Sequence, residues 1–81
     1  MTQFDKMYKK IMEDPIHADL DIDEIKNFLK KLGFEHRIKG TSHNIFTHQD
    51  YPGIIVVPTK HGRHVKGVYI KKIREAIIEI E

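Results

Sequence analysis

Three short segments of strand character, separated by two turn segments, occupy residues 34–58 and restrict the fold more than any other feature of this chain. The first segment alternates with a period of two, and the last is a β-branched run that Pro58 ends. Because both turns are short, the strands are expected to form an antiparallel meander. We predict strands at residues 34–39, 42–48 and 53–58, with turns at residues 40–41 and 49–53.

Amphipathic helices are predicted on both sides of this meander. Apolar residues repeat at helical spacing before Pro15 and again from Tyr69. Between them, a helix that starts at Asp21 and stops at Gly33 has the clearest local signals, because Asp21 with Glu24 forms a capping box. The predicted order, α-α-β-β-β-α, belongs to the α+β class, with helices on one face of the sheet and the other face open.

Length and composition restrict the class of protein further. The chain has 81 residues, which suit a single domain (residues 1–81) with a modest core. It has no cysteine, so disulfides and thiolate metal sites are excluded, and no apolar run is long enough to span a bilayer. The first residues lack the order of a signal peptide. We therefore expect a cytoplasmic protein with no membrane partner.

Charge is unevenly distributed along the chain. Residues 1–35 carry 6 Lys/Arg and 8 Asp/Glu, whereas residues 36–81 carry 8 Lys/Arg and 4 Asp/Glu. Five of the six histidines lie between His36 and Arg74, where Asp50 is the only acid. A basic, histidine-rich half favours a polyanion such as RNA, although a solvated basic face explains the charge about as well.

Residues 40–46, Gly-Thr-Ser-His-Asn-Ile-Phe, are the best candidate for a functional site. A glycine turn followed by Thr41 and Ser42 delivers His43 to the start of a strand, beside backbone amides and hydroxyl groups. Imidazole exchanges protons near neutral pH, and clustered N–H and O–H donors suit a phosphate or an oxyanion. On this stretch alone, an ordinary turn followed by a half-buried strand is the favoured interpretation.

The histidines are not spaced for metal binding. His43 and His48 are five apart in one strand, so they point to opposite faces. His61 and His64 could converge, but no carboxylate or cysteine lies near them, and zinc-finger and His-Glu-x-x-His spacings are absent. We predict no metal site and no cofactor.

Cleavage of RNA without a metal is chemically attainable for such a chain. It needs a group that takes the proton from a ribose 2′-OH, donors that stabilise charge on the phosphoryl oxygens, and a proton for the leaving 5′-oxygen. A histidine can serve as base or acid in this reaction. Four cations occur in segments that could adjoin the Gly40 turn: Lys39, Lys60, Arg63 and Lys66.

Several stretches of the chain, in their order and spacing, resemble the HicA family of toxins. They are Leu32-Gly33-Phe34-Glu35, Gly40-Thr41-Ser42-His43-Asn44-Ile45-Phe46, Ile54-Ile55-Val56-Val57-Pro58, His61-Gly62, Val65-Lys66 and Tyr69-Ile70-Lys71-Lys72-Ile73. The resemblance runs from about Asp19 to Ile80. Residues 1–18 look like the extension helix that some members carry, and residues 19–81 look like the family's core.

The resemblance implies a double-stranded-RNA-binding-domain-like fold, an mRNA interferase activity and inhibition by a HicB-type antitoxin. The family's catalytic histidine stands in a Gly-Ser-His turn, which corresponds to His43 here. The chain differs by inserting Thr41 between Gly40 and Ser42. It also has Asn44 where many relatives have a second histidine, which indicates that position 44 is not needed for the chemistry.

We therefore predict the toxin of a type II toxin–antitoxin system, an endoribonuclease that cleaves mRNA with His43 as general acid or base. The groups predicted to bind the RNA are Lys39, Gly40, Thr41, Ser42, Lys60, Arg63 and Lys66. The alternative is a non-catalytic RNA-binding module of the same fold. A third interpretation is a protein-interaction domain whose site has decayed and whose only ligand is the antitoxin. The remaining histidines are interpreted as surface or RNA-contacting groups (His48, His61, His64) or as incidental (His17, His36).

Overall fold

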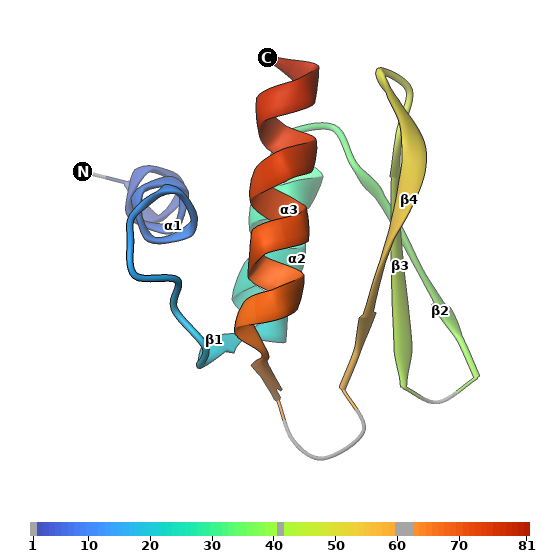
Figure 1. Cartoon of the computed structure of the whole chain (residues 1–81). Coiled ribbons are helices and arrows are strands. Elements are labelled where there is room, and N and C mark those ends of the chain that lie inside the picture. Colours follow the sequence, from blue (N-terminus) through green and yellow to red (C-terminus); the bar gives the residue numbers. More distant parts are fainter. Residues whose placement is uncertain (1, 41, 60–62) are drawn as a thin grey trace.

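A computed structural model describes residues 2–40, 42–59 and 63–81 of the chain and confirms the α+β class (Figure 1). The predicted order of helices and strands is present, with two additional two-residue strands. The elements are α1 Gln3–Met12, β1 Leu20–Asp21, α2 Ile22–Lys31, β2 Glu35–Lys39, β3 His43–His48, β4 Tyr51–Pro58, β5 His64–Val65 and α3 Gly67–Ile80.

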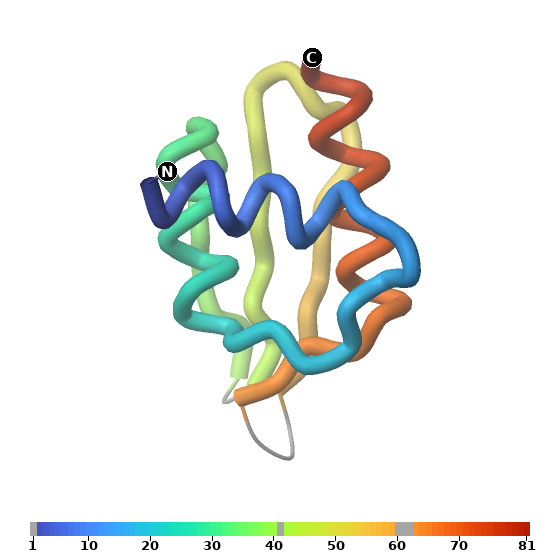
Figure 2. Tube along the Cα trace, turned by 90° about the vertical axis from the view of Figure 1, so that its left-hand side faces the viewer, coloured from blue at the N-terminus to red at the C-terminus, as the bar shows by residue number. Residues whose placement is uncertain are grey.

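The main sheet is the predicted antiparallel meander, in the order β2-β3-β4. Helices α2 and α3 lie side by side against one face of this sheet, and α1 lies on the far side of those two helices (Figure 1). Seen from the helical side, α1 crosses over both α2 and α3 (Figure 2). The molecule is therefore layered as α1, then α2 with α3, then the sheet, and no described helix covers the second face of the sheet.

The hydrophobic core lies between the sheet and the helices. Alternate residues of the central strands point into it, because successive side chains of a strand face opposite sides. Phe46 of β3 and Ile55 of β4 pair across the sheet and are fully buried, with Ile73 and Ile77 of α3 in the same cluster. Ile45 is also buried, at 7% exposure, but it does not belong to this cluster. Its side chain is therefore on the other face.

Strand β4 is longer than the sequence predicts, since it begins at Tyr51 rather than at residue 53. Pro52 and Gly53 resemble a turn locally, but proline is tolerated in an edge strand, where its missing N–H faces away from the ladder. β4 is such an edge strand. A register shift between Phe46 and His48 accommodates the additional pairing.

The segment predicted as a polar loop, residues 59–66, contains the short strand β5. It pairs with β1 through Leu20 and Val65, and Asp21 pairs with His64. A strand of two residues is too short to show the alternation of polar and apolar residues by which strands are predicted, and its partner is more than forty positions away in the chain. This pairing fastens the chain between β4 and α3 to the start of α2.

The starts of α1 and α2 are capped by side chains in different ways, whereas Lys66 at the start of α3 makes no side-chain capping hydrogen bond. Thr2 and Asp5 form a complete capping box at the start of α1. The capping box predicted for α2 is replaced by a shorter contact, in which the carboxylate of Asp21 accepts a hydrogen bond of 2.7 Å from the amide of Asp23. Gly33 ends α2 with a φ of +98°, a conformation that favours glycine.

Helix α1 is held to the rest of the domain by polar and apolar contacts. Met7 and Ile11 are buried in the common core. The guanidinium of Arg74 on α3 donates to the carbonyl oxygens of Ile11 (2.8 Å) and Glu13 (2.7 Å) and contacts the carboxylate of Asp14 at 3.0 Å. Arg74 therefore satisfies carbonyl groups that the end of a helix leaves without partners.

Candidate functional site

His43 is the first residue of the central strand β3, and its side chain is exposed. In the sheet it is paired with Lys39 of β2 and with Pro58 of β4. Its neighbour Asn44 and the next alternate residue, Phe46, point toward the helices. Because side chains alternate along a strand, His43 lies with Ile45 on the face that no described helix covers (Figure 1).

Two cations share this uncovered face with the imidazole. Lys39 stands directly opposite His43, so their Cβ atoms are about 5 Å apart. Arg37, two residues earlier on β2, is opposite Ile45 and has the same facing. Both cations are exposed. The imidazole is therefore neither buried among aliphatic side chains nor separated from the cations, and a phosphate approaching His43 would meet positive charge beside it.

The backbone immediately before His43 is fixed to strand β4. The carbonyl oxygen of Ser42 accepts a hydrogen bond of 2.9 Å from the amide of Thr59 and a longer one of 3.4 Å from the Thr59 hydroxyl. Gly40 has a φ of +66°, and a Cβ there would meet nothing within 4 Å. The glycine is therefore suited to the turn by its backbone conformation and not by crowding. Together these features hold His43 at a defined point of the hairpin.

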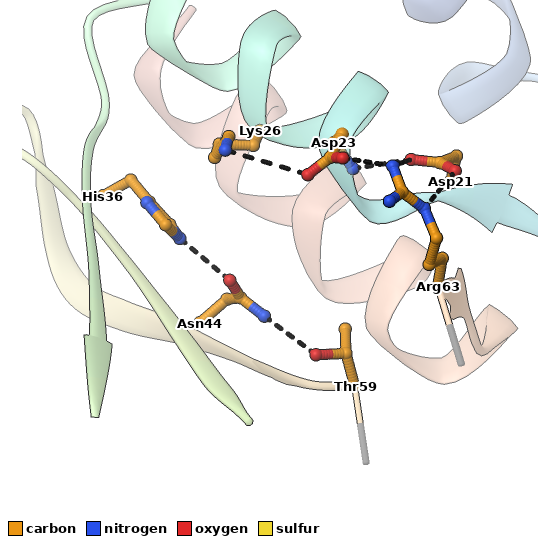
Figure 3. A network of polar contacts seen from close by, with 7 residues as sticks. All are labelled: Asp21, Asp23, Lys26, His36, Asn44, Thr59 and Arg63. Atoms are coloured by element: carbon orange, nitrogen blue, oxygen red, sulfur yellow. Dashed lines mark hydrogen bonds and ion pairs between the residues drawn. The ribbon is translucent and has the colours of Figure 1, made fainter. Parts of the chain in front are cut away.

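A buried amide lies behind this point, on the helix side of the sheet. Asn44 is 8% exposed, and its amide nitrogen donates to the carbonyl oxygen of Val57 (3.2 Å) and to the hydroxyl of Thr59 (3.3 Å). Its amide oxygen is 2.9 Å from Nε2 of His36 (Figure 3). The ring of His36 packs against Phe46. With the amide oriented in this way, Nε2 of His36 carries a proton and donates it. The chain of hydrogen bonds continues through Thr59 to Ser42.

Arg63 lies close to α2 rather than to the hairpin. Its guanidinium forms an ion pair of 3.2 Å with the carboxylate of Asp21 and a second, very short one with Asp23, which also contacts Lys26 (Figure 3). The hydrogen bond from Arg63 lowers the pKa of Asp21 below its ordinary value, and the same contact raises the pKa of Arg63. The backbone carbonyl of Arg63 also accepts from the amide of Ile22 at 2.8 Å. The structure thus gives Arg63 a structural role and does not bring it beside His43.

The remaining predicted RNA-binding groups lie at one end of the molecule or outside the described residues. The β2–β3 hairpin, the end of β4 and the start of α3 gather at the same end of the molecule (Figure 1). Lys66 is the N-cap residue of α3 and is exposed at that end. Thr41 and Lys60, together with His61, lie outside the residues that the structure describes.

The other described histidines have local partners. His48 packs on Phe34, its Nε2 is 3.1 Å from the carbonyl oxygen of Leu32, and its Nδ1 accepts from the amide of Asp50. His64 is bonded to the carbonyl of Asp19, and His17 to the carboxylate of Glu13. These contacts suit structural roles, and they leave His43 as the described histidine on the uncovered, basic face. Across residues 2–40, 42–59 and 63–81, no group of three or more histidine and acidic side chains is placed to hold a metal ion.

Asn44, His36 and Thr59 support the site from behind, and the sequence patterns alone do not single them out. The available signal was the alternation along β3, which places Asn44 on the same side as Phe46 and therefore inside. A polar residue at an inward position needs a hydrogen-bond partner. The strand register that supplies those partners is not visible in a single sequence.

Fold and site together define a small α+β domain with an exposed histidine on a basic sheet face. A sequence model described as "HicA toxin of bacterial toxin-antitoxin" matches residues 22–78. The chain therefore belongs to the HicA toxin family of toxin–antitoxin systems, and this membership implies a HicB-type antitoxin as its partner. No curated protein sequence and no solved structure matches the chain. Among the described helices, none has the length and apolar character needed to cross a membrane.

Proposed function

We propose that this chain is an mRNA interferase in which His43 acts as general acid or base and no metal takes part. The observation that carries the proposal is the exposed imidazole of His43 at the mouth of a hairpin, opposite Lys39, in a member of the HicA family. General acid–base chemistry needs an accessible titratable group within reach of the ribose 2′-OH or the 5′-oxygen. An exposed histidine on an open face meets that requirement.

In the proposed reaction, the ribose 2′-oxygen attacks the adjacent phosphorus after losing its proton, and the bond from phosphorus to the 5′-oxygen breaks. A proton passes to the leaving 5′-oxygen, so the products are a 2′,3′-cyclic phosphate and a 5′-hydroxyl end. Lys39 stabilises negative charge on the phosphoryl oxygens, and the amides and hydroxyl group of the hairpin around Gly40, Thr41 and Ser42 are proposed to hold them. Lys60, Arg63 and Lys66 are proposed to contact the RNA backbone, Arg63 only if its ion pairs with Asp21 and Asp23 open.

The test is RNA cleavage by the purified toxin in the presence of a chelator. His43→Ala is expected to lower the cleavage rate by about 10²–10⁴-fold, the range that general acid–base catalysis supplies. His17→Ala is the matched control, because His17 is hydrogen-bonded to Glu13 far along the chain from the hairpin, and it should leave the rate unchanged. Cleavage products with 2′,3′-cyclic phosphate ends would support attack by the 2′-oxygen.

Two other results would contradict the proposed nuclease activity and support one of the alternative functions. Equal RNA binding without cleavage by the wild type and by His43→Ala would identify the alternative, a non-catalytic RNA-binding module. Neither binding nor cleavage, together with tight binding of the antitoxin, would identify an interaction domain whose site has decayed.

A further inference from the structure

A groove runs between α1 and α2, on the helical side of the molecule. It has a volume of about 330 Å³ and is lined by one stripe of each helix. Six of the nine lining residues are polar or charged, and three are apolar. Gln3, Phe4, Lys6, Met7 and Lys10 come from α1, and Glu24, Asn27, Phe28 and Lys31 come from α2.

The rim of this groove is positively charged. Lys6, Lys10 and Lys31 are exposed, and none of the three forms an ion pair with any residue that the structure describes. Glu24 is the only acid among the lining residues. Three cations against one anion leave the groove with an excess of positive charge that its own domain does not neutralise.

The base of the groove is apolar and aromatic. The rings of Phe4 and Phe28 are in contact, with centroids 4.9 Å apart. Phe28 is buried, whereas Phe4 remains partly exposed. An apolar base below a basic rim suits a ligand that has carboxylates on both sides of a bulky apolar side chain. The apolar side chain would be buried against the base, and the carboxylates would pair with the lysines of the rim.

This groove exists only because α1 is present. The family model begins at residue 22, so α1 lies outside the matched region, whereas α2 and the site around His43 lie inside it. The groove is therefore a surface that the extension adds to the family's domain. Helix α1, which forms one wall of the groove, lies on the opposite side of α2 and α3 from the sheet that carries His43 (Figures 1 and 2).

We propose that the groove between α1 and α2 is a docking site for the HicB-type antitoxin, separate from the face that carries His43, and that it takes an acidic segment with one bulky apolar side chain. The proposal rests on the toxin–antitoxin pairing and not on the catalytic role of His43. A protein segment with a bulky apolar side chain fits this groove, because the base is apolar and the rim carries an excess of positive charge.

The experiment compares two double variants with the same change in net charge. Lys10→Glu/Lys31→Glu reverses two rim lysines, and Lys9→Glu/Lys30→Glu reverses their sequence neighbours in the same last turns of α1 and α2, which do not line the groove. Affinity for the cognate antitoxin is measured by titration calorimetry at two salt concentrations, and cleavage of RNA by the isolated toxin is measured in parallel. Circular dichroism establishes that each variant is folded.

We expect the groove variant to bind the antitoxin about tenfold more weakly or worse at low salt, with a smaller deficit at high salt, and the control variant to bind like the wild type. RNA cleavage should be the same in both variants. Equal antitoxin affinity for the two variants would overturn the proposal, and so would a groove variant that loses RNA cleavage while keeping its affinity for the antitoxin. If charge reversal unfolds the groove variant, Lys10→Ala/Lys31→Ala against Lys9→Ala/Lys30→Ala makes the same comparison with a good helix-forming residue.

Discussion

Asn44 joins the three strands of the main sheet through one side chain. Its amide nitrogen reaches β4 at Val57 and the residue after the strand, Thr59, and its amide oxygen reaches β2 at His36. A buried amide is costly unless its donors and acceptor are paired, and here each has a partner. The residue stabilises the sheet at the point where His43 emerges on the other face.

Replacing Asn44 by alanine is expected to lower the free energy of unfolding by about 1–3 kcal/mol, because the groups on β2 and β4 lose their partner. Urea denaturation followed by circular dichroism measures this change. Thr47→Ala is the control, since Thr47 lies on the uncovered face of the same strand and its loss should cost less than about 0.5 kcal/mol. Equal destabilisation by both variants would mean that the hydrogen bonds of Asn44 contribute no net stability.

Lys39 is the cation nearest to His43 by strand register, so its contribution should be electrostatic. Lys39→Ala is expected to weaken RNA binding and to reduce the slope of log K against log salt by about 0.7, the value for one phosphate contact on a single strand. Filter binding or fluorescence anisotropy over a salt series measures the slope. The control Lys9→Ala, on α1, should leave the slope unchanged. If Lys39→Ala also leaves the slope unchanged, the RNA does not contact Lys39.

The position of a single residue could be predicted from the sequence where neighbouring residues in the chain determine it. The exposed position of His43 follows from a glycine turn and the first residue of a strand, both visible in seven consecutive residues. The contacts of Asn44 and Arg63 were not predictable, because their partners lie 8 to 42 positions away and are brought close by strand register and tertiary packing. For Asn44 the prediction considered only chemistry, whereas the structure shows a packing and hydrogen-bonding role.

At the scale of elements, the start of α2 is the place where distant segments meet. Asp21 caps the helix, pairs with His64 in the two-stranded ladder and forms an ion pair with Arg63. The helix N-terminus favours negative charge at Asp21 for a further reason, the alignment of its peptide dipoles. Capping and ion pairing therefore both stabilise the ionised carboxylate.

This lowered pKa of Asp21 predicts the pH dependence of stability. In the unfolded chain the carboxyl titrates near ~3.9, and in the folded chain it titrates lower, so the unfolded state binds more protons as the pH falls through that range. The stabilisation is present above the unfolded pKa and is lost as the pH falls through the folded pKa. Arg63→Ala should therefore flatten the fall in unfolding midpoint below about pH 4. Thermal unfolding over a pH series measures the slope.

The control for this comparison is Arg37→Ala, which removes an exposed arginine with no ion pair among the described residues. In this variant the unfolding midpoint should fall below about pH 4 as steeply as in the wild type. If the unfolding midpoint of Arg63→Ala falls below about pH 4 as steeply as that of the wild type, then capping of the helix, and not Arg63, controls the titration of Asp21.

Elements with strong local signals were predicted well, and elements that depend on pairing were not. The limits of α2 follow from Asp21 and Gly33, and both are confirmed. The sequence predicts that β4 starts at residue 53, two residues later than it does. Pro52 and Gly53 favour a turn in most contexts, but an edge strand such as β4 tolerates them. The ladder of β1 with β5 has no signal in the sequence, because strands of two residues have no period.

At the scale of the whole molecule, α1 closes the core from the side opposite the sheet. Its buried residues join the same cluster as the sheet residues, and Arg74 ties its end to α3. Tyr8 adds a hydrogen bond of 2.6 Å to the carboxylate of Glu81. We therefore propose that residues 1–81 unfold as one cooperative unit, although α1 lies outside the region that matches the family.

Ile11 tests that proposal, because it is fully buried in α1 and far from the sheet in sequence. Ile11→Ala is expected to cost about 2–5 kcal/mol, the range for a buried isoleucine, and to lower the unfolding midpoint of the entire domain. Native-state hydrogen exchange measures how the cost is distributed. If the domain is one unit, the slowest-exchanging amides of β3 and β4 should lose as much protection as those of α1, because both exchange through global unfolding.

The matched control applies the same substitution to Ile78, an isoleucine of α3 that is 58% exposed. Ile78→Ala should change the stability by less than about 0.5 kcal/mol, since the side chain already contacts water in the folded state. Loss of protection limited to the amides of α1 in Ile11→Ala would instead show that the extension detaches alone. Residues 19–81 would then form an autonomous core, and the groove between α1 and α2 would open and close with the helix that forms one of its walls.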